Sequence, residues 1–220
     1  MKRVLFHVGM PRTGSSSLQY FLHHNPALLK ELGWKYHDKV FSQTALQHTQ
    51  IWHLMKARRL RDGRANMCLE KYLEEAIASS GDLNLIFSCE SLSYDWFRIP
   101  ERSRNFLTTL AHRNGWECCL FLRDQESFAE SLWRRCRVSP KMDGVPEMGT
   151  RLSLKEFRNS PYLKRWYEDR YGMKAMLSAF PWVTFIEYSP DRDAVSDFMC
   201  NILRYSGELP PHPRLNVSPK

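Results

Sequence analysis

Residues 3–19 read Arg-Val-Leu-Phe-His-Val-Gly-Met-Pro-Arg-Thr-Gly-Ser-Ser-Ser-Leu-Gln. The apolar run at the start of this stretch predicts a strand, the Gly/Pro segment a loop, and the three serines the first turn of a helix. The spacing Gly9-x4-Gly14 fits the P-loop pattern, but Ser15 stands where that pattern requires lysine. The nearest cation is Arg12, inside the loop. The stretch therefore predicts an anion site that differs from that of an ordinary ATPase or GTPase.

The chemistry of the loop supports an anion. The first amides of a helix lack intrahelical partners and lie at the positive end of the helix dipole, where phosphate or sulfate binds well. Gly14 admits a backbone conformation that a Cβ would oppose, and it lets an anion approach closely. Ser15 and Ser16 add hydroxyl donors, and Arg12 adds a permanently charged planar guanidinium. Taken alone, the segment is also compatible with a strand, a turn and a serine N-cap that bind nothing.

Length and composition indicate a globular protein of one domain, covering residues 1–220. The hydrophobic fraction of 43% argues against disorder. The net charge of +8 is compatible with a nucleic acid, a membrane surface or an anionic small ligand. Its basic residues are scattered, and the densest group lies within 56–64. Because no nucleic-acid recognition motif accompanies that charge, we expect no nucleic-acid partner.

The six cysteines include no C-x2-C pair, so we expect no zinc site and interpret all six as buried free thiols. The N-terminal residues read as a strand rather than a signal peptide, and no apolar run approaches the length of a membrane span. These features together predict a cytoplasmic protein without a membrane span.

Short apolar runs alternate with amphipathic stretches along the chain. The runs predict strands over 4–8, 34–36, 83–89, 116–122 and 182–188. The stretches predict helices over 15–24, 27–32, 44–60, 67–79, 101–113, 125–136, 161–179 and 193–204, with a long loop over 138–150. This alternation predicts an α/β fold, a three-layer α/β/α arrangement like that of the P-loop NTPases with a central parallel sheet of about five strands.

Polar residues stand at two further strand ends, where parallel sheets bind their ligands. Glu90 follows the run over 83–89 and is a candidate general base, although a carboxylate at such a position, taken alone, is more often an N-cap or part of a structural ion pair. Arg123 ends the run over 116–122 just before a helix, which places a guanidinium beside a second helix N-terminus. Ser131 lies about two turns into that helix.

Two of these segments resemble the PAPS-dependent sulfotransferases, especially the bacterial and carbohydrate-type members. The segment Gly-Met-Pro-Arg-Thr-Gly-Ser-Ser-Ser-Leu-Gln resembles their 5′-phosphosulfate loop, and Arg123 with Ser131 eight residues later resembles their 3′-phosphate motif. The order of the two motifs and their separation match that family as well. The resemblance spans residues 3–136 well and the remainder loosely.

The resemblance implies a site. The loop would bind the 5′-phosphosulfate of PAPS (3′-phosphoadenosine-5′-phosphosulfate) through Pro11, Arg12, Thr13, Gly14, Ser15, Ser16 and Ser17. Arg123 and Ser131, with Arg214 as a further candidate, would bind the 3′-phosphate. Arg12 stands in the place of the usual catalytic lysine, and since arginine does not give up a proton, it would act by charge alone. Glu90 ranks first as the base, ahead of His7 and of the more distant His23 and His24.

The function that follows is transfer of a sulfuryl group from PAPS to a hydroxyl or amine of a small-molecule, carbohydrate or lipid acceptor, with PAP as the product and no metal. We expect the acceptor to be bound by segments near 38–66 and 138–160. A P-loop small-molecule kinase or NTPase and a non-enzymatic nucleotide-binding module are the alternatives.

Overall fold

The computed structural model describes residues 2–9, 12–38, 46–56, 64–138, 149–161, 163–164 and 173–215. Its centre is a five-stranded sheet in the order β2-β3-β1-β4-β5, in which every neighbouring pair is parallel. The strands are β1 (Val4–His7), β2 (Trp34–Tyr36), β3 (Asn84–Ser88), β4 (Glu117–Leu122) and β5 (Trp182–Glu187). The predicted parallel sheet is thereby confirmed, and each strand lies within one residue of the predicted bounds at either end.

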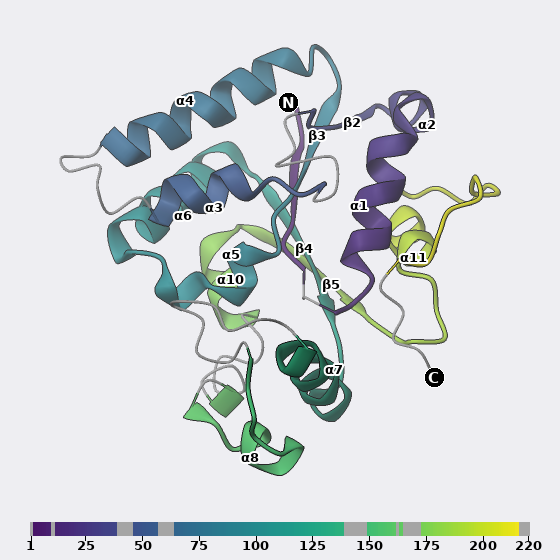
Figure 1. Cartoon of the computed structure of the whole chain (residues 1–220). Coiled ribbons are helices and arrows are strands. Elements are labelled where there is room, and N and C mark those ends of the chain that lie inside the picture. The colour runs from purple at the N-terminus through teal and green to yellow at the C-terminus, as the bar shows by residue number, and fades with distance from the viewer. Residues whose placement is uncertain are drawn as a thin grey trace.

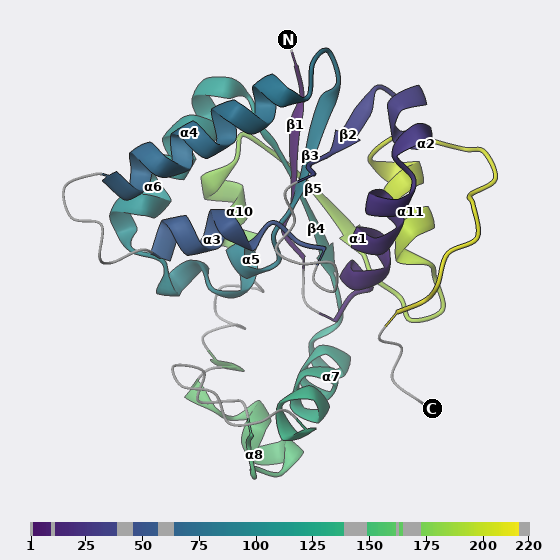
Figure 2. The ribbon, with the colours of Figure 1, turned by 45° about the horizontal axis from the view of Figure 1, so that its top comes forward.

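Helices cover both faces of the sheet (Figures 1 and 2). One face carries α1 (Ser15–His24), α2 (Pro26–Glu31) and α11 (Ala194–Asn201). The other carries α3 (Thr49–Lys56), α4 (Arg64–Ser79), α5 (Ser91–Tyr94), the 3-10 turn η1 (Trp96–Arg98), α6 (Glu101–Asn114) and α10 (Met173–Ala179). This is the predicted three-layer α/β/α architecture.

The side chains of β1 point alternately to the two faces of the sheet, which explains why helices cover both faces. Phe6 points into the core under α4 and α6, where its ring stacks on that of Phe87 with centroids 5.1 Å apart. Leu5 points the other way, into the core under α1 and α11. Successive strand residues face opposite sides of a sheet, so a strand that is apolar at every position needs a helix layer on each side. His7 falls on the same side as Leu5 and is fully buried there.

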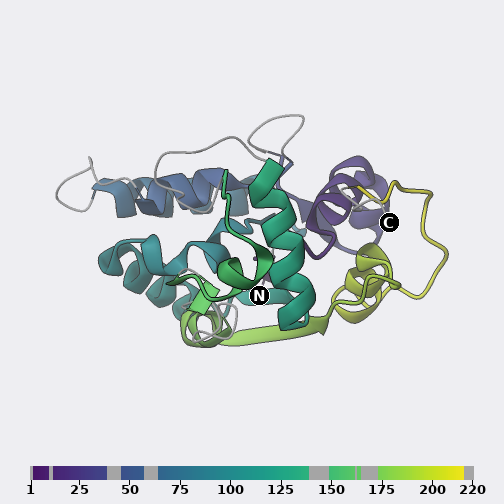
Figure 3. The same cartoon turned by 60° about the horizontal axis from the view of Figure 1, so that its bottom comes forward.

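Two helices lie beyond the carboxyl ends of the strands rather than over a face. They are α7 (Gln125–Val138), which follows β4 directly, and α8 (Leu154–Arg158), which packs beside α7 (Figures 2 and 3). A capping box starts α8, since Ser153 accepts from the Glu156 amide while the Glu156 carboxylate accepts from the Ser153 amide. Among the described residues, α7 therefore forms one wall at the end of the sheet where ligands bind in such folds.

Two predictions need correction, the start of one helix and the burial of all six cysteines. The helix predicted over 44–60 begins only at Thr49, because the His48 amide donates to the Ser88 carbonyl and this stretch runs along β3 first. The helix predicted over 161–179 is described as α10 at its C-terminal end, and 165–172 lies outside the described residues, as does most of the loop over 138–150. The cysteines are buried except Cys68 and Cys200, which are exposed on helices. In the described part of the chain, no helix is long and apolar enough to cross a bilayer.

Gly14 joins the loop after β1 to the helix layer. It is the N-cap of α1, with a φ of +79°, and a Cβ built there would lie 2.7 Å from the Cβ of Ala194 at the start of α11. Such a distance is a clash. Glycine is therefore required twice at this position, for its left-handed backbone and for the close approach of α11.

A comparison of two glycines separates these two requirements. Gly33 has nearly the same φ, +77°, but nothing lies within 4 Å of an added Cβ. We expect Gly33→Ala to lower the free energy of unfolding by about 1–2 kcal/mol, and Gly14→Ala by a further 1–3 kcal/mol or so from overpacking. Urea denaturation measures both values.

The double variant Gly14→Ala/Ala194→Gly should recover the packing part of the loss once the effect of Ala194→Gly alone is subtracted. Equal losses for Gly14→Ala and Gly33→Ala would show that the contact with α11 contributes nothing.

Candidate functional site

The predicted site residues gather where the strands end. The loop after β1 leads into α1, Glu90 follows β3, and Arg123 follows β4 (Figure 2). Met10 and Pro11 lie outside the described residues, so the prediction for Pro11 stays a prediction. Arg12 has a φ of +69°, in the left-handed region that non-glycine residues rarely adopt. This strained backbone needs support from its surroundings.

Direct hydrogen bonds join the two predicted motifs. Nη1 of Arg123 donates to the carbonyl oxygen of Arg12 at 2.8 Å, which supports the left-handed turn. Nε of Arg12 donates to the Oγ of Ser131 at 2.9 Å. Ser131 is buried, so this face of α7 is turned toward the loop rather than toward solvent. The structure thus brings together the three residues that the sequence analysis placed in separate motifs.

Arg123 has two more partners that fix its side chain. Its Nε donates to the Oγ of Ser127 at 2.8 Å, and its guanidinium carbon lies 5.2 Å from the ring centroid of Tyr188, which follows β5. Ser127 in turn is held by Asp124, whose carboxylate accepts from the Ser127 amide and hydroxyl at the start of α7. These bonds lower the pKa of Asp124. The arginine is therefore held on three sides by the protein itself.

Positive charge is concentrated around Arg12. Burial lowers the pKa of Arg12, and the charges of Arg135 and Arg123 lower it further, while Tyr188 and Glu90 act in the opposite direction. Three guanidinium groups close enough to influence one another make an environment that favours an anion. Together with the backbone amides at the start of α1, they form a donor set suited to phosphate or sulfate oxygens.

Glu90 contacts α1, the helix that follows the loop. Its Oε1 accepts from the Gln19 side-chain amide at 3.1 Å, and a hydrogen bond from the Ser15 hydroxyl also reaches its carboxylate. Burial raises the pKa of Glu90 to about 7, although these bonds and the charge of Arg12 oppose the rise. A carboxylate that titrates near neutrality beside a cation has the properties of a general base.

Two buried histidines near the site are held neutral. His7 is fully buried, its Nδ1 lies 2.8 Å from the Oγ of Ser88, and burial lowers its pKa to about 3. His48, in the segment predicted to bind the acceptor, is also fully buried, with a pKa lowered by burial to about 3. Its Nδ1 accepts from the Ser88 amide and its Nε2 lies 2.9 Å from the His37 carbonyl. Both nitrogens of His48 thus serve the protein's own backbone.

The C-terminal tail returns to the first turn of α1. The Leu215 amide donates to the Oγ of Ser17 at 2.7 Å, so this predicted loop hydroxyl already has a protein partner. Further back, the His212 ring contacts the Asp193 carboxylate, the N-cap of α11, at 2.9 Å. Arg214 lies between these two anchors and is exposed. The tail therefore brings Arg214 close to the first turn of α1, and its predicted role stays a prediction.

Four residues of this cluster were not anticipated: Gln19, Ser127, Arg135 and Tyr188. Helical spacing contains the signal for three of them. Gln19 lies four residues after Ser15 in α1, and Ser127, Ser131 and Arg135 follow at intervals of four along α7. Residues at that spacing share one helix face. Tyr188 carries no such signal, because its position depends on how β5 ends relative to β4.

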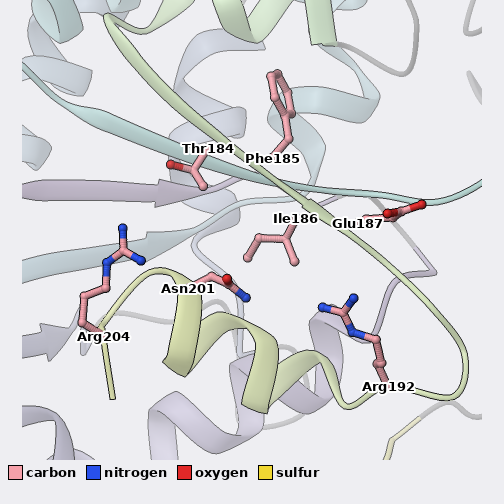
Figure 4. Close-up of a pocket in the computed structure, with 7 residues that line it drawn as sticks. All are labelled: Thr184, Phe185, Ile186, Glu187, Arg192, Asn201 and Arg204. Carbon is pink, nitrogen blue, oxygen red and sulfur yellow. The ribbon is translucent and has the colours of Figure 1, made fainter. Parts of the chain in front are cut away.

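A separate cavity of about 380 Å³ lies along β5 and the flanks of α11 (Figure 4). Arg192, Asn201 and Arg204 point from that side toward the strand, and the remaining lining residues belong to β5. Arg192 is paired with Asp197, with Nη2 and Oδ1 2.7 Å apart. None of the predicted site residues lines this cavity. Across the described part of the chain, no cluster of three or more His, Cys, Asp or Glu could hold a metal ion.

Few known proteins resemble this chain. No protein-family model matches the chain, and no curated protein matches it. Among solved structures, the chain is similar to retinol dehydratase in complex with androsterone and inactive cofactor PAP, with 14% sequence identity and a TM-score of 0.29. The match covers 92% of this chain but only 57% of that protein. The description of the fold rests on the parallel strand order, and that of the site on the contacts between its residues.

The raised pKa of Glu90 predicts a pH-dependent stability. Its ordinary pKa is 4.5 and its folded pKa is about 7, so the folded state binds more protons than the unfolded state in that interval. Stability from this group is therefore fully present below pH 4.5 and declines up to about pH 7. Because Glu90→Gln cannot ionise, we expect it to gain on the order of 1–3 kcal/mol relative to the wild type between pH 4 and pH 8.

Urea denaturation at both pH values measures this gain. Glu74→Gln, on the exposed surface of α4, is the matched control and should show no such trend. A difference between Glu90→Gln and wild type that does not change with pH would mean that folding leaves the pKa of Glu90 unchanged.

Proposed function

We propose that the protein is a sulfotransferase that uses PAPS as the donor. One observation carries the proposal: residues 111 and 119 positions apart in the chain meet through the Arg123–Arg12 and Arg12–Ser131 hydrogen bonds. The sequence resemblance requires a 5′-phosphosulfate loop and a 3′-phosphate motif to serve one ligand. Their contact at the end of the sheet supports that requirement.

The donor set suits a nucleotide with anionic groups at both ends. The amides at the start of α1, with Ser15 and Ser16, would hold the 5′-phosphosulfate. Arg123, with Ser131, would hold the 3′-phosphate, which distinguishes PAPS from ATP. Arg214 is proposed as a further contact from the tail. Neither role requires a metal ion, because fixed guanidinium groups provide the positive charge.

The same residues suggest how the transfer would proceed. Glu90 would take the proton of the acceptor hydroxyl or amine as that oxygen or nitrogen forms its bond to sulfur. The bond from sulfur to the bridging oxygen breaks, and its electron pair leaves with PAP. Arg12 would stabilise the negative charge that develops on that oxygen. The Arg12 side chain is already oriented by Ser131, so little reorganisation is needed at that moment.

The acceptor is proposed to be a small-molecule, carbohydrate or lipid group, bound by the segments near 38–66 and 138–160. The described parts of those segments include α3, where the Lys56 ammonium lies 4.3 Å from the ring centroid of Trp52, and α8 beyond the strand ends. An aromatic side chain beside a cation suits a sugar or phenol ring with polar substituents. We also propose that the protein is a single domain and that it is located in the cytoplasm.

Binding of PAP tests the donor. Calorimetry should show PAP bound more tightly than ADP or AMP, without Mg²⁺. We expect Arg123→Ala to weaken PAP by about 10- to 100-fold, the worth of one or two charge-assisted hydrogen bonds, and to weaken AMP far less. AMP is the necessary reference because Arg123 also supports the loop through the Arg12 carbonyl.

Arg134→Ala serves as the control, since Arg134 is an exposed α7 residue paired with Glu130. Equal binding of ADP and PAP by the wild type, or no PAP binding at high micromolar concentration, would refute the proposal. Magnesium-dependent ATP turnover would replace it with the kinase alternative.

Arg12 is expected to act mainly on the rate. After an acceptor has been found by screening with labelled PAPS, Arg12→Ala should lower kcat by roughly 100- to 1,000-fold, the usual loss for one preorganised charge donor, with PAP affinity changed only a few-fold. Arg12→Lys retains the charge and should keep much of the rate. An unchanged kcat in Arg12→Ala would exclude a role for its charge in the transfer.

A further inference from the structure

Gln19 links Glu90 to Ser88 and His7, two buried polar side chains of the sheet. Gln19 lies one helical turn into α1 and is 5% exposed. Its side-chain amide nitrogen is within hydrogen-bonding distance of two acceptors. That nitrogen donates to the Oε1 of Glu90 at 3.1 Å and to the Oγ of Ser88 at 3.0 Å. A side-chain amide has two N–H groups. Both are therefore used.

Ser88 joins Gln19 to a further buried side chain. Its hydroxyl oxygen lies 3.0 Å from the Gln19 amide nitrogen and 2.8 Å from the Nδ1 of His7. The Ser88 oxygen accepts from the Gln19 amide, and the Ser88 hydroxyl shares one hydrogen bond with the Nδ1 of His7. The Nε2 of His7 is buried without a hydrogen-bond partner and faces the edges of aromatic rings.

The ionised form of Glu90 requires one orientation of the Gln19 amide. An ionised carboxylate can only accept a hydrogen bond, so it must face an N–H of the amide rather than its carbonyl oxygen. The bond to Ser88 holds the amide nitrogen on the same side. A donor at this point favours the ionised carboxylate and restricts its rotation.

We propose that Gln19 is a positioning residue for Glu90. Its side-chain amide, held in place by the bond to Ser88, favours the ionised form of the Glu90 carboxylate and orients that carboxylate toward the loop. The orientation itself follows from the geometry alone, whereas the purpose assigned to it, proton removal from an acceptor, rests on the proposed sulfotransferase function. Gln19 would not touch the substrate.

Besides Gln19, four groups lie close enough to Glu90 to affect its titration or to be affected by its charge. Arg12 in the loop contributes positive charge, and the Ser15 hydroxyl donates a hydrogen bond from the first turn of α1. Tyr36 from β2 and the adjacent Cys89 thiol lie close enough for the Glu90 charge to raise their pKa values. Both stay protonated near neutrality, so Glu90 is the group of this set that titrates there.

The decisive measurement is the titration of Glu90 itself. Infrared spectra over pH 4–9 follow the C=O band of the protonated carboxyl group, which is assigned by its loss in Glu90→Gln. In Gln19→Met, which keeps the side-chain length but removes both donors, we expect the midpoint to move upward by about 1 in pH. Ser88→Ala should give a smaller upward movement, since it frees the amide to turn. Gln50→Met, on the exposed side of α3, is the matched control.

An unchanged midpoint in Gln19→Met and in Ser88→Ala would overturn the proposal. Activity provides a second readout: the acidic limb of the kcat/KM profile should move upward in Gln19→Met while the KM for PAPS changes little. A rate reduced equally at all pH values would indicate a merely structural role and would also overturn it. If the midpoint moves but the wild type transfers no sulfuryl group to any acceptor, the positioning role stands and the proposed function fails.

Discussion

The hydrogen bond from Arg123 to the carbonyl of Arg12 is the contact on which the site depends. It crosses from the end of β4 to the loop after β1, two strands that are neighbours in the sheet. A non-glycine residue at a φ of +69° costs about 1–2 kcal/mol in backbone strain. A charged donor on its carbonyl offsets a cost of that size. The bond also places two guanidinium groups at one spot, and that placement gives the site its charge.

Burial at this spot opposes charge of either sign. It raises the pKa of Glu90 to about 7 and lowers that of Arg12. The attraction between the two groups acts in the opposite direction but does not cancel either shift. An anion in the loop would stabilise the charge on Arg12 and would oppose ionisation of Glu90. Donor binding and the proton affinity of Glu90 are therefore linked, and the Gln19 amide acts against that linkage by favouring the carboxylate.

The sequence was sufficient for the sheet and for the strand-end positions of Glu90 and Arg123, because both follow from short-range patterns. Apolar runs and Gly/Pro punctuation located β1 to β5, and the position of Glu90 and Arg123 at strand ends follows from the parallel order. What could not be predicted depends on distant pairing. His48 extends along β3 instead of starting a helix because its amide reaches Ser88. Tyr188 meets Arg123 only through the register of β5 on β4.

The first turn of α1 is held from three directions, which explains how it can be a binding site and a structural joint together. Gly14 is pressed against α11, Ser17 binds the tail at Leu215, and Ser15 reaches Glu90 beyond β3. Each of these contacts is made by the protein's own residues, and together they fix the amides at the helix start. A site already ordered in this way loses little conformational entropy when an anion binds. Gly14, predicted for its room beside an anion, therefore contributes as much through the helix that it lets approach.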